Sequence, residues 1–398
     1  DADFVVRYQG GNNAGHTVVN EFGTFKLHLL PSGVFNPKVM NILGPGMVID
    51  IEGLVKEIAD LRGRGIDPVI RISERATICF PFHRYQDEWE EERLGKRAYG
   101  STRRGIAPAY GDRTTKKAIQ LGELLFPDVF QRHLQEIVEW KHLQASGIYG
   151  KDKPFTYEEM LDWSENYGGQ IKHLICDTST MLEEAAAAGK NILFEAQLGT
   201  LRDLNFGIYP YTTSSCALAS YAPIGGGLFR HKPDHIIAVV KAFSTCVGEG
   251  PFVTLMAPEE ADPLREIAGE YGAATGRPRT LGHFDALATR YGAWAQGASE
   301  VALTKLDCLS GIKTLKICTD YRYRGKLVGR FPLNPILEEA EPVYIEMPGW
   351  EEDITGVRRF EDLPKAAQDY VLEIERRIEC PVRFVSVGPE RAALIDRA

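Results

Sequence analysis

Short apolar runs that end at glycine, proline or a polar loop recur along the chain, and this pattern predicts strands. The runs are residues 4–8, 25–30, 39–43, 191–194, 236–242, 300–306 and 382–385. Apolar residues at helical spacing follow Asp50, which can cap a helix, and they recur over residues 363–378. Alternating strands and helices indicate a parallel sheet with crossover helices.

We therefore expect one α/β domain over residues 1–398, with a mainly parallel central sheet flanked by helices and with helical insertions. The sequence contains no internal repeat, no low-complexity tract and no obvious linker. Residues 236–242 read as a buried strand, whereas residues 85–99 are dense in charge and typical of a solvated helix face.

Composition narrows the class of protein. The chain is 44% hydrophobic, which is ample for a large core, and no apolar run approaches the ~20 residues that span a bilayer. The formal net charge of -9 argues against a nucleic-acid partner. The seven cysteines are scattered without a C-x-x-C pair, which argues against disulfides and zinc and for a reducing compartment. We expect a cytoplasmic enzyme with no membrane partner.

The predicted strand at residues 4–8 leads into a glycine-rich loop, residues 9–17. Its three glycines have no Cβ, so the backbone can turn sharply and present N–H groups to an anion. His16 places an imidazole at the edge of this loop, where it could donate a proton. These residues alone fit a plain turn with a solvated histidine equally well, because short glycine motifs often arise by chance.

Other loops carry donors suited to anions. Residues 100–110 combine two aliphatic hydroxyls, two arginines and two glycines, and hydroxyls and arginines both donate to phosphate oxygens. A basic surface loop is the alternative. Residues 195–200 follow the carboxyl end of a predicted strand, where open α/β sheets bind ligands, and residues 209–215 add a hydroxyl-rich loop.

Arg277 and Arg279 lie two positions apart on a glycine-containing loop. Their guanidinium groups repel each other unless an anion lies between them, and a dicarboxylate or a phosphate would satisfy both. Two salt-bridged surface arginines remain the alternative.

Asp307 follows the predicted strand at residues 300–306 and completes a K-x-D motif with Lys305. A carboxylate at this place can accept hydrogen bonds from two donors of guanine, a pair that adenine lacks. The aliphatic part of Lys305 can cover the base. The motif is weak alone and stronger at the end of a strand. The loop at residues 386–389 could close over the base or the ribose.

Taken together, these segments resemble the adenylosuccinate synthetases, GTP-dependent ligases that join L-aspartate to IMP. Residues 7–17 resemble the opening signature of that family. The resemblance continues in family order through residues 100–110, 209–215, 271–285, 304–307, 347–350 and 386–389. It implies a P-loop-NTPase-like architecture, Mg²⁺ as cofactor and a homodimer. It also implies that GTP phosphorylates the 6-oxygen of IMP and that the aspartate amine then displaces phosphate, giving adenylosuccinate.

The resemblance implies roles for individual residues. The catalytic positions are His16 and Gln197. The positions implied for IMP are Asn13, Ala14, Gly15, His16, Thr102, Lys117, Gln197, Thr213 and Arg277. Those implied for aspartate are Arg104, Ala273, Ala274, Thr275, Gly276, Arg277 and Arg279. Those implied for GTP are Gly15, His16, Thr17, Arg279, Lys305, Leu306, Asp307, Ser386, Val387 and Gly388. The carbonyl of Gly15 is the implied metal ligand, and Lys117 is expected to reach the neighbouring subunit's IMP site.

The chain departs from the family pattern at several places. A G-D-E-G-K-G-K segment, whose aspartate removes a proton from IMP, does not precede Asp1, so we expect the sequence to be truncated. Gln197 is shifted by one residue, and Lys117 replaces an arginine, which keeps the charge but loses the bidentate geometry. Pro278 also replaces an arginine.

These departures keep three other functions open. The first is a related ligase that acts on another purine nucleotide, and the second is a catalytically silent nucleotide-binding homologue. The third is a GTPase switch, which would share Asp307 but would not need the arginine pair.

Overall fold

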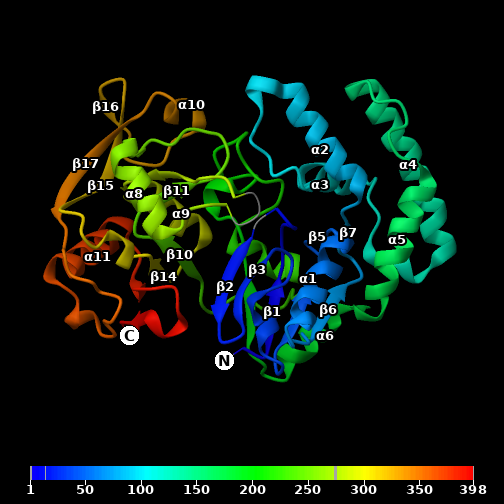
Figure 1. Ribbon diagram of the computed structural model, residues 1–398, viewed down its shortest axis with the longest axis horizontal. Helices are drawn as coiled ribbons and strands as arrows, with labels where there is room; N and C mark the ends of the chain where they lie inside the picture. The colour runs from blue at the N-terminus through cyan, green and yellow to red at the C-terminus, as the bar shows by residue number, and fades with distance from the viewer. Residues whose placement is uncertain (1, 14, 273–275, 398) are drawn as a thin grey trace. The chain divides into compact units, whose positions relative to one another are not determined.

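The computed structural model describes residues 2–13, 15–272 and 276–397, and they form two compact units (Figure 1). The first unit comprises Asp1–Val18 and Phe25–Lys232, and the second comprises Val19–Thr24 and Pro233–Ala398. Each unit has its own hydrophobic core. The expectation that the whole chain is one domain stays a prediction.

A five-stranded sheet forms the centre of the first unit. Its order is β8-β6-β4-β1-β9, and every neighbouring pair is parallel. The strands are β1 (Phe4–Arg7), β4 (Met40–Leu43), β6 (Ile70–Ser73), β8 (Ile175–Cys176) and β9 (Ile192–Glu195). The predicted α/β class with a mainly parallel sheet is therefore confirmed. In the same unit β5 (Val48–Ile49) pairs with β7 (Thr77–Ile78). A further short pair joins β2 (His16–Asn20) with β3 (Gly23–Leu27), of which residues 19, 20, 23 and 24 belong to the second unit.

Helices surround this sheet in the first unit. They are α1 (Ile51–Gly63), α2 (Pro81–Leu94), α3 (Ile106–Thr115), α4 (Pro127–Tyr149), α5 (Tyr157–Ile171), α6 (Thr178–Ala187) and α7 (Ala222–Gly226). As predicted, Asp50 caps α1, because its carboxylate accepts a hydrogen bond from the N–H of Gly53 at 3.2 Å. The apolar face of α1, which includes Ile51 and Leu54, is buried in the core.

The prediction of a solvated face over residues 85–99 is wrong for two of its acidic residues. Asp87 and Glu91 of α2 are only 6% and 8% exposed, whereas Glu88 and Glu92 on the same helix are exposed. The two buried residues are four positions apart, so they share one face of α2. Apolar periodicity cannot detect a carboxylate that is buried against hydrogen-bond donors of another segment.

The second unit contains a mixed sheet of order β10-β14-β18-β19, in which only the last pair is antiparallel. Its strands are β10 (Ile237–Lys241), β14 (Glu300–Thr304), β18 (Val382–Ser386) and β19 (Leu394–Asp396). A second sheet is built on the long antiparallel pair of β15 (Thr314–Tyr323) with β17 (Glu341–Pro348), and β13 (Phe284–Asp285) and β16 (Lys326–Leu327) join it. A short antiparallel pair joins β11 (Ser244–Cys246) and β12 (Thr280–Gly282).

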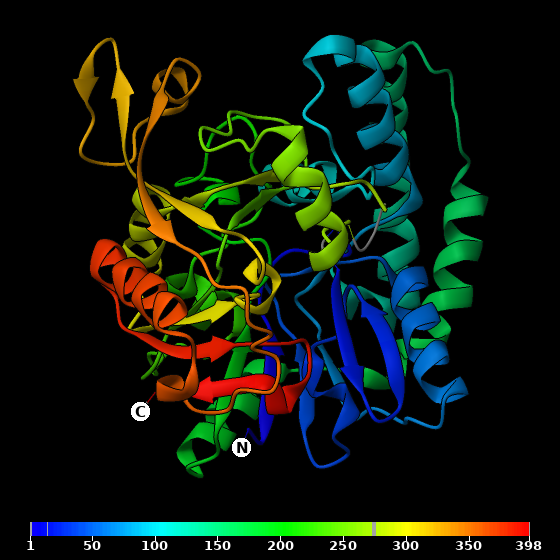
Figure 2. The same cartoon turned by 60° about the vertical axis from the view of Figure 1, so that its left-hand side comes forward.

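Four helices complete the second unit: α8 (Pro258–Ala268), α9 (Ala286–Gln296), α10 (Asn334–Leu337) and α11 (Lys365–Ile378). Figure 2 shows α11 beside β18. The strand predicted at residues 236–242 is present as β10, but it is not buried. Ile237 and Val239 are 46% and 74% exposed, whereas the alternate residues Ala238 and Val240 pack against the core of the unit, so only one face of β10 is covered. Over the described ranges, no helix combines the length and apolar character needed to cross a membrane.

Candidate functional site

The opening loop of the first unit leaves the carboxyl end of β1 and is packed tightly against Gln197. Gly10 has a φ of 75°, and a Cβ on it would lie 1.7 Å from Nε2 of Gln197, so a larger residue here would be strained and would displace the Gln197 amide. Nε2 of Gln197 donates to the carbonyl oxygen of Gly11 and to Oδ1 of Asn13, both at 3.3 Å, and its Oε1 accepts from Arg7. The amide of Gln197 therefore joins β1 to the loop, despite the one-residue shift in the sequence.

His16 follows the loop and faces a carboxylate. Its Nδ1 lies 3.3 Å from Oε1 of Glu195, which is also 3.4 Å from the guanidinium of Arg7. Sheet register creates this group, because Arg7 and Glu195 stand opposite each other at the ends of β1 and β9. Burial lowers the pKa of His16, although the charge of Glu195 opposes the shift. Nε2 of His16 is buried and has no hydrogen-bond partner among the described residues, so it remains available to a ligand.

Thr213 joins the opening loop from a distant segment. Its hydroxyl accepts a hydrogen bond from Nδ2 of Asn13 at 3.4 Å. The loop that carries Thr213 is folded around the buried carboxylate of Asp203, which accepts from the backbone N–H groups of Asn205, Phe206 and Ala217. The structure thus brings Asn13, Gln197 and Thr213 into one hydrogen-bonded group.

The loop that carries Thr102 and Arg104 lies between α2 and α3 and is tied to the same region. Tyr110 of α3 accepts a hydrogen bond from the N–H of Gly10 at 2.8 Å and donates to the carbonyl of Gly46 at 2.7 Å. The ring of Tyr99 packs edge-on against Tyr211, with centroids 6.3 Å apart. This contact joins the segment that leads to Thr102 to the loop of Thr213.

Lys117 follows α3 and rests on an aromatic ring. Its Nζ lies 5.3 Å from the centroid of Trp140, a cation–π contact within the first unit. The role expected of Lys117 in a neighbouring subunit stays a prediction.

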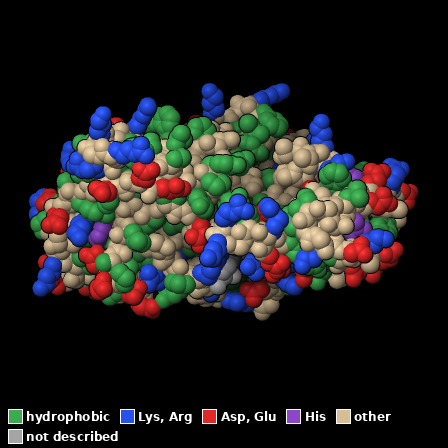
Figure 3. Space-filling model, turned by 90° about the horizontal axis from the view of Figure 1, so that it is seen from above, with side chains coloured by type: hydrophobic (Ala, Val, Ile, Leu, Met, Phe, Trp, Pro, Cys, Tyr) green, Lys and Arg blue, Asp and Glu red, His purple; other side chains and the backbone are tan. Residues whose placement is uncertain are grey.

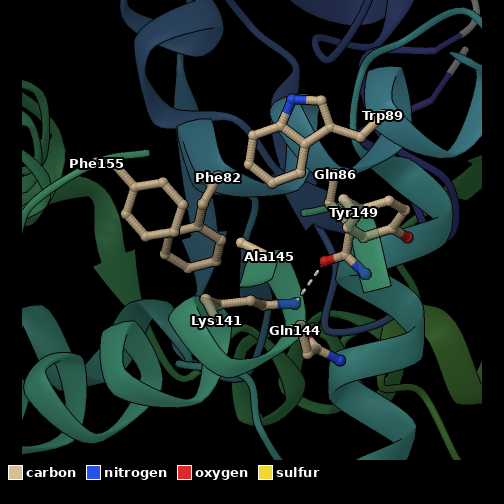
Figure 4. A pocket seen from close by; sticks show the side chains of 8 residues that line it. All are labelled: Phe82, Gln86, Trp89, Lys141, Gln144, Ala145, Tyr149 and Phe155. Atoms are coloured by element: carbon tan, nitrogen blue, oxygen red, sulfur yellow. Dashed lines mark hydrogen bonds between the residues drawn. The ribbon is translucent and has the colours of Figure 1, made fainter. Parts of the chain in front are cut away.

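A small hollow between α2 and α4 is not the predicted site (Figure 4). It is lined by Phe82, Gln86, Trp89, Lys141, Gln144, Ala145, Tyr149 and Phe155, and none of these is a predicted site residue. Nζ of Lys141 donates to Oε1 of Gln86 at 2.8 Å, as Figure 4 shows, and lies 2.5 Å from a carboxylate oxygen of Asp112. The charge of Lys141 is therefore used to hold α3 against α4.

In the second unit, Glu270 forms ion pairs with three cationic side chains. Its carboxylate lies 2.8 Å from Nζ of Lys241, 2.6 Å from the guanidinium of Arg279 and 2.7 Å from Nζ of Lys305. Glu270 is 0% exposed, and burial alone would raise its pKa, but the three cations together lower it to about 2. Burial lowers the pKa of Lys241 to about 8, against the effect of Glu270. We call these four residues the Glu270 cluster.

The Glu270 cluster contains three cationic side chains and one carboxylate, so its net charge is positive. Figure 3 shows Lys and Arg side chains next to Asp and Glu side chains over much of the viewed face, so positive charge for an anion has to come from such local groups. Sequence reasoning included Arg279 and Lys305 but missed Lys241 and Glu270. Lys241 could have been found as a charged residue at the carboxyl end of the apolar run 236–242. No feature of the sequence pointed to Glu270.

The predicted guanine positions lie at the adjacent ends of β14 and β18. The N–H of Leu306 donates to the carbonyl of Ser386 at 3.3 Å, and the hydroxyl of Ser386 donates to the carbonyl of Gly388 at 2.8 Å. Burial raises the pKa of Asp307, which is half-buried beside these residues. Val387 is buried in the core.

Some predicted positions are described only in part or not at all. Ala14, Ala273, Ala274 and Thr275 lie outside the described residues. The N–H of Gly272 donates to the carbonyl of Arg277 at 2.8 Å, and the N–H of Gly276 donates to the carbonyl of Gly272 at 2.7 Å. Gly15 is half-buried and Thr17 is exposed on β2. Within the described ranges, no three His, Cys, Asp or Glu side chains gather in a way that could hold a metal ion.

Comparison with known proteins identifies the family. The family model for adenylosuccinate synthetase matches residues 1–395. The chain is 51% identical to adenylosuccinate synthetase 2 of Pseudoalteromonas translucida over 401 residues, which cover 100% of this chain and 94% of that protein. It is 42% identical to the adenylosuccinate synthetase of a Geobacillus species, with 98% and 92% of the two chains covered.

A solved structure agrees with these relatives. The fully ligated adenylosuccinate synthetase from Plasmodium falciparum matches this structure with a TM-score of 0.93 and 33% identity, over 100% of this chain and 94% of that one. This chain therefore belongs to the adenylosuccinate synthetase family, the ligases that use GTP to join L-aspartate to IMP.

Proposed function

We propose that the residues at the carboxyl edge of β1 and β9 catalyse the ligation of L-aspartate to IMP, with GTP converted to GDP and phosphate. One observation carries this proposal: Asn13, Gln197 and Thr213 come from three separate segments and form one hydrogen-bonded group beside His16. Ligands of parallel α/β sheets bind at this edge, and the family membership gives the ligands their chemical identity.

His16 serves the phosphoryl transfer from GTP to the 6-oxygen of IMP. Its neutral imidazole is favoured in the free protein, because burial lowers its pKa. An anionic phosphoryl group next to Nε2 would raise that pKa again, so that His16 carries a proton where negative charge develops. Glu195 lies on the Nδ1 side of the ring, which orients Nε2 toward the ligand.

The aspartate amine then displaces phosphate from the 6-position. Phosphorylation turns a poor leaving group into a good one, and the protein contributes mainly position and charge. Gln197 is held by Arg7, Gly11 and Asn13, so its amide has a fixed orientation toward the base.

Other residues bind the parts of the substrates that do not react. Thr102, Thr213 and Asn13 bind the IMP phosphate, and Lys117 of a second copy in a homodimer completes that site. Arg104, Arg277 and Arg279 bind the aspartate carboxylates, with Ala273, Ala274, Thr275 and Gly276 of the same loop. Lys305, Asp307, Ser386 and Gly388 bind guanine.

Mg²⁺ fits the donors that remain. Magnesium at a nucleotide site keeps several waters and needs only one or two protein ligands besides the phosphates, so a group of three acidic side chains is not required. The carbonyl of Gly15 would hold the ion together with the phosphates of GTP, and the ion would neutralise phosphate charge during transfer.

The test is an absorbance assay for adenylosuccinate on the purified protein. The mixture contains IMP, GTP, Mg²⁺ and L-aspartate, and each is omitted in turn. We expect product only when all four are present. Turnover with another purine nucleotide in place of IMP would overturn the substrate assignment. Nucleotide binding without any product would identify a catalytically silent homologue.

A further inference from the structure

Two buried carboxylates of α2, Asp87 and Glu91, lack a cationic partner. Both lie beneath the segment 99–105, and neither is within ion-pair distance of a lysine or arginine in the part of the chain that the structure describes. A buried charge is costly unless hydrogen bonds satisfy it, so these carboxylates must be retained by their donors.

The donors all belong to the segment 99–105. Glu91 accepts hydrogen bonds from the backbone N–H groups of Tyr99, Gly100 and Ser101, each at 3.0 Å. Asp87 accepts from the hydroxyl of Ser101 at 2.7 Å and from the N–H of Gly105 at 2.9 Å. Five donors of one short loop therefore point at two carboxylates one helical turn apart.

These bonds fix both ends of the loop to α2. The beginning, residues 99–101, and the end, Gly105, are bound to α2, so residues 102–104 form an arch between them. A Cβ on Gly105, whose φ is 76°, would lie 2.7 Å from the backbone of His83 in α2, so the close approach depends on glycine. The loop cannot move away from α2 without breaking several charge-assisted hydrogen bonds.

The arch carries the donors that the proposed function uses. Arg103 turns back to Glu88 on α2, with its guanidinium 3.4 Å from the carboxylate. Across the described residues, the hydroxyl of Thr102 and the guanidinium of Arg104 have no hydrogen-bond partner of their own, and both side chains are half-buried. Donors without internal partners on a fixed arch are prepared for an anion.

We propose that Asp87 and Glu91 are positioning residues for the IMP phosphate: by binding the loop 99–105, they hold Thr102 in place before the nucleotide arrives. The same bonds hold Arg104, which the proposed function assigns to L-aspartate. The inference rests on the proposed function, because that function assigns Thr102 to the IMP phosphate. It adds that the affinity for IMP is determined in part by two acidic side chains that never touch the substrate.

The first experiment compares Glu91→Gln with Glu92→Gln, the same change at an exposed neighbouring position of α2. An amide oxygen can replace only one of the two carboxylate oxygens, so Glu91→Gln loses some of the hydrogen bonds that hold the loop. We expect the KM for IMP to rise about tenfold or more, because small misplacements of binding groups are costly, while kcat and the KM for GTP stay within about twofold. Glu92→Gln should leave all three constants unchanged.

Hydrogen exchange gives a second readout that needs no substrate. Amide exchange in the peptide that spans residues 99–105 should be faster in Glu91→Gln than in the parent protein, and unchanged in Glu92→Gln. Adding Glu91→Gln to Thr102→Ala should cost little further affinity for IMP, because both changes act on one contact.

Several outcomes would overturn the proposal. An unchanged KM for IMP, or a fall in kcat alone together with a lower Tm, would give Glu91 a purely structural role. Ser101→Ala removes a single donor to Asp87, and it takes the place of Glu91→Gln if that variant does not fold. If the parent protein ligates IMP and all variants bind IMP normally, only the positioning role fails; if the parent does not use IMP, the proposed function fails first.

Discussion

Buried carboxylates organise both units, but they bind different partners. In the first unit, Asp87, Glu91 and Asp203 accept hydrogen bonds mainly from backbone N–H groups of loops. In the second unit, Glu270 binds cationic side chains. The first arrangement fixes the course of a backbone, and the second arranges charge.

The titration behaviour of the two groups differs for the same reason. Burial raises the pKa of Asp87, because hydroxyl and N–H dipoles only partly compensate the loss of water. Three full positive charges lower the pKa of Glu270 to about 2, although burial opposes them. Loops that bind an anion through their own donors need the first kind of support, whereas a site that binds through lysine and arginine needs the second.

Among the changes considered, removal of the charge of Glu270 should reduce the stability of the protein most. In Glu270→Gln, three cations would repel one another without their common partner, which should cost about 3 kcal/mol of the free energy of unfolding. The KM for GTP should rise as well. Urea unfolding followed by circular dichroism measures the loss of unfolding free energy. Glu259→Gln, at an exposed position of α8, is the matched control. An unchanged unfolding midpoint would show that the cluster does not stabilise the fold.

Asp203→Asn should have the next largest effect and should act on the first unit. An asparagine has one acceptor oxygen in place of the two carboxylate oxygens that accept from the N–H groups of Asn205, Phe206 and Ala217. We therefore expect the free energy of unfolding to fall by about 2 kcal/mol. The KM for IMP should rise while the KM for GTP stays constant. Steady-state kinetics with both nucleotides test this, with Asp152→Asn as the exposed control. A selective change in the KM for GTP would contradict the division of roles.

Lowering the pH should affect the stability contributed by Glu270 and by Asp87 in opposite directions. The pKa of Glu270 is lowered from 4.5 to about 2, so its stabilisation is present above pH 4.5 and is lost as the pH falls toward 2. The pKa of Asp87 is raised, so its protonation works in the opposite sense and favours the folded state. The difference in unfolding free energy between the parent protein and Glu270→Gln should therefore narrow by about 2 kcal/mol between pH 6 and pH 3. A constant difference over this range would contradict the assignment.

The smallest effect concerns Lys241. Its pKa is lowered to about 8, so its positive charge is lost as the pH rises through 8. If this charge supports GTP binding, the KM for GTP should increase about fivefold between pH 7 and pH 9, since one half-exposed charge contributes about 1 kcal/mol. Lys241→Arg keeps its charge and should abolish the increase. A pH profile that is identical in both proteins would remove Lys241 from the GTP site.

Sequence reasoning succeeded where the signal is local. The apolar run at residues 4–8, the cap at Asp50 and the glycines of the opening loop each depend on neighbours in the chain, and all are present as expected. The family signature also selected Asn13 and Thr213, which the structure joins. Their roles in catalysis and binding stay predictions.

The missed features depend on contacts between distant segments. Asp87 and Glu91 lie in a stretch whose charge density indicates solvent, and only the return of residues 99–105 buries them. The two arginines 277 and 279 suggested a shared external anion, yet Arg279 pairs with Glu270 of its own chain. A charge pattern shows that a partner is needed, but it does not show whether that partner is a ligand or another part of the protein.

The arch of residues 102–104 has a consequence for protein design. Because Asp87 and Glu91 of α2 accept the hydrogen bonds of this loop, the shape of the loop is determined mostly outside residues 102–104. Those three positions can be randomised in a library while Asp87, Glu91 and Gly105 are kept constant. The scaffold would then present many side chains on the same backbone, which makes this arch a natural place to alter how the protein binds an anionic group.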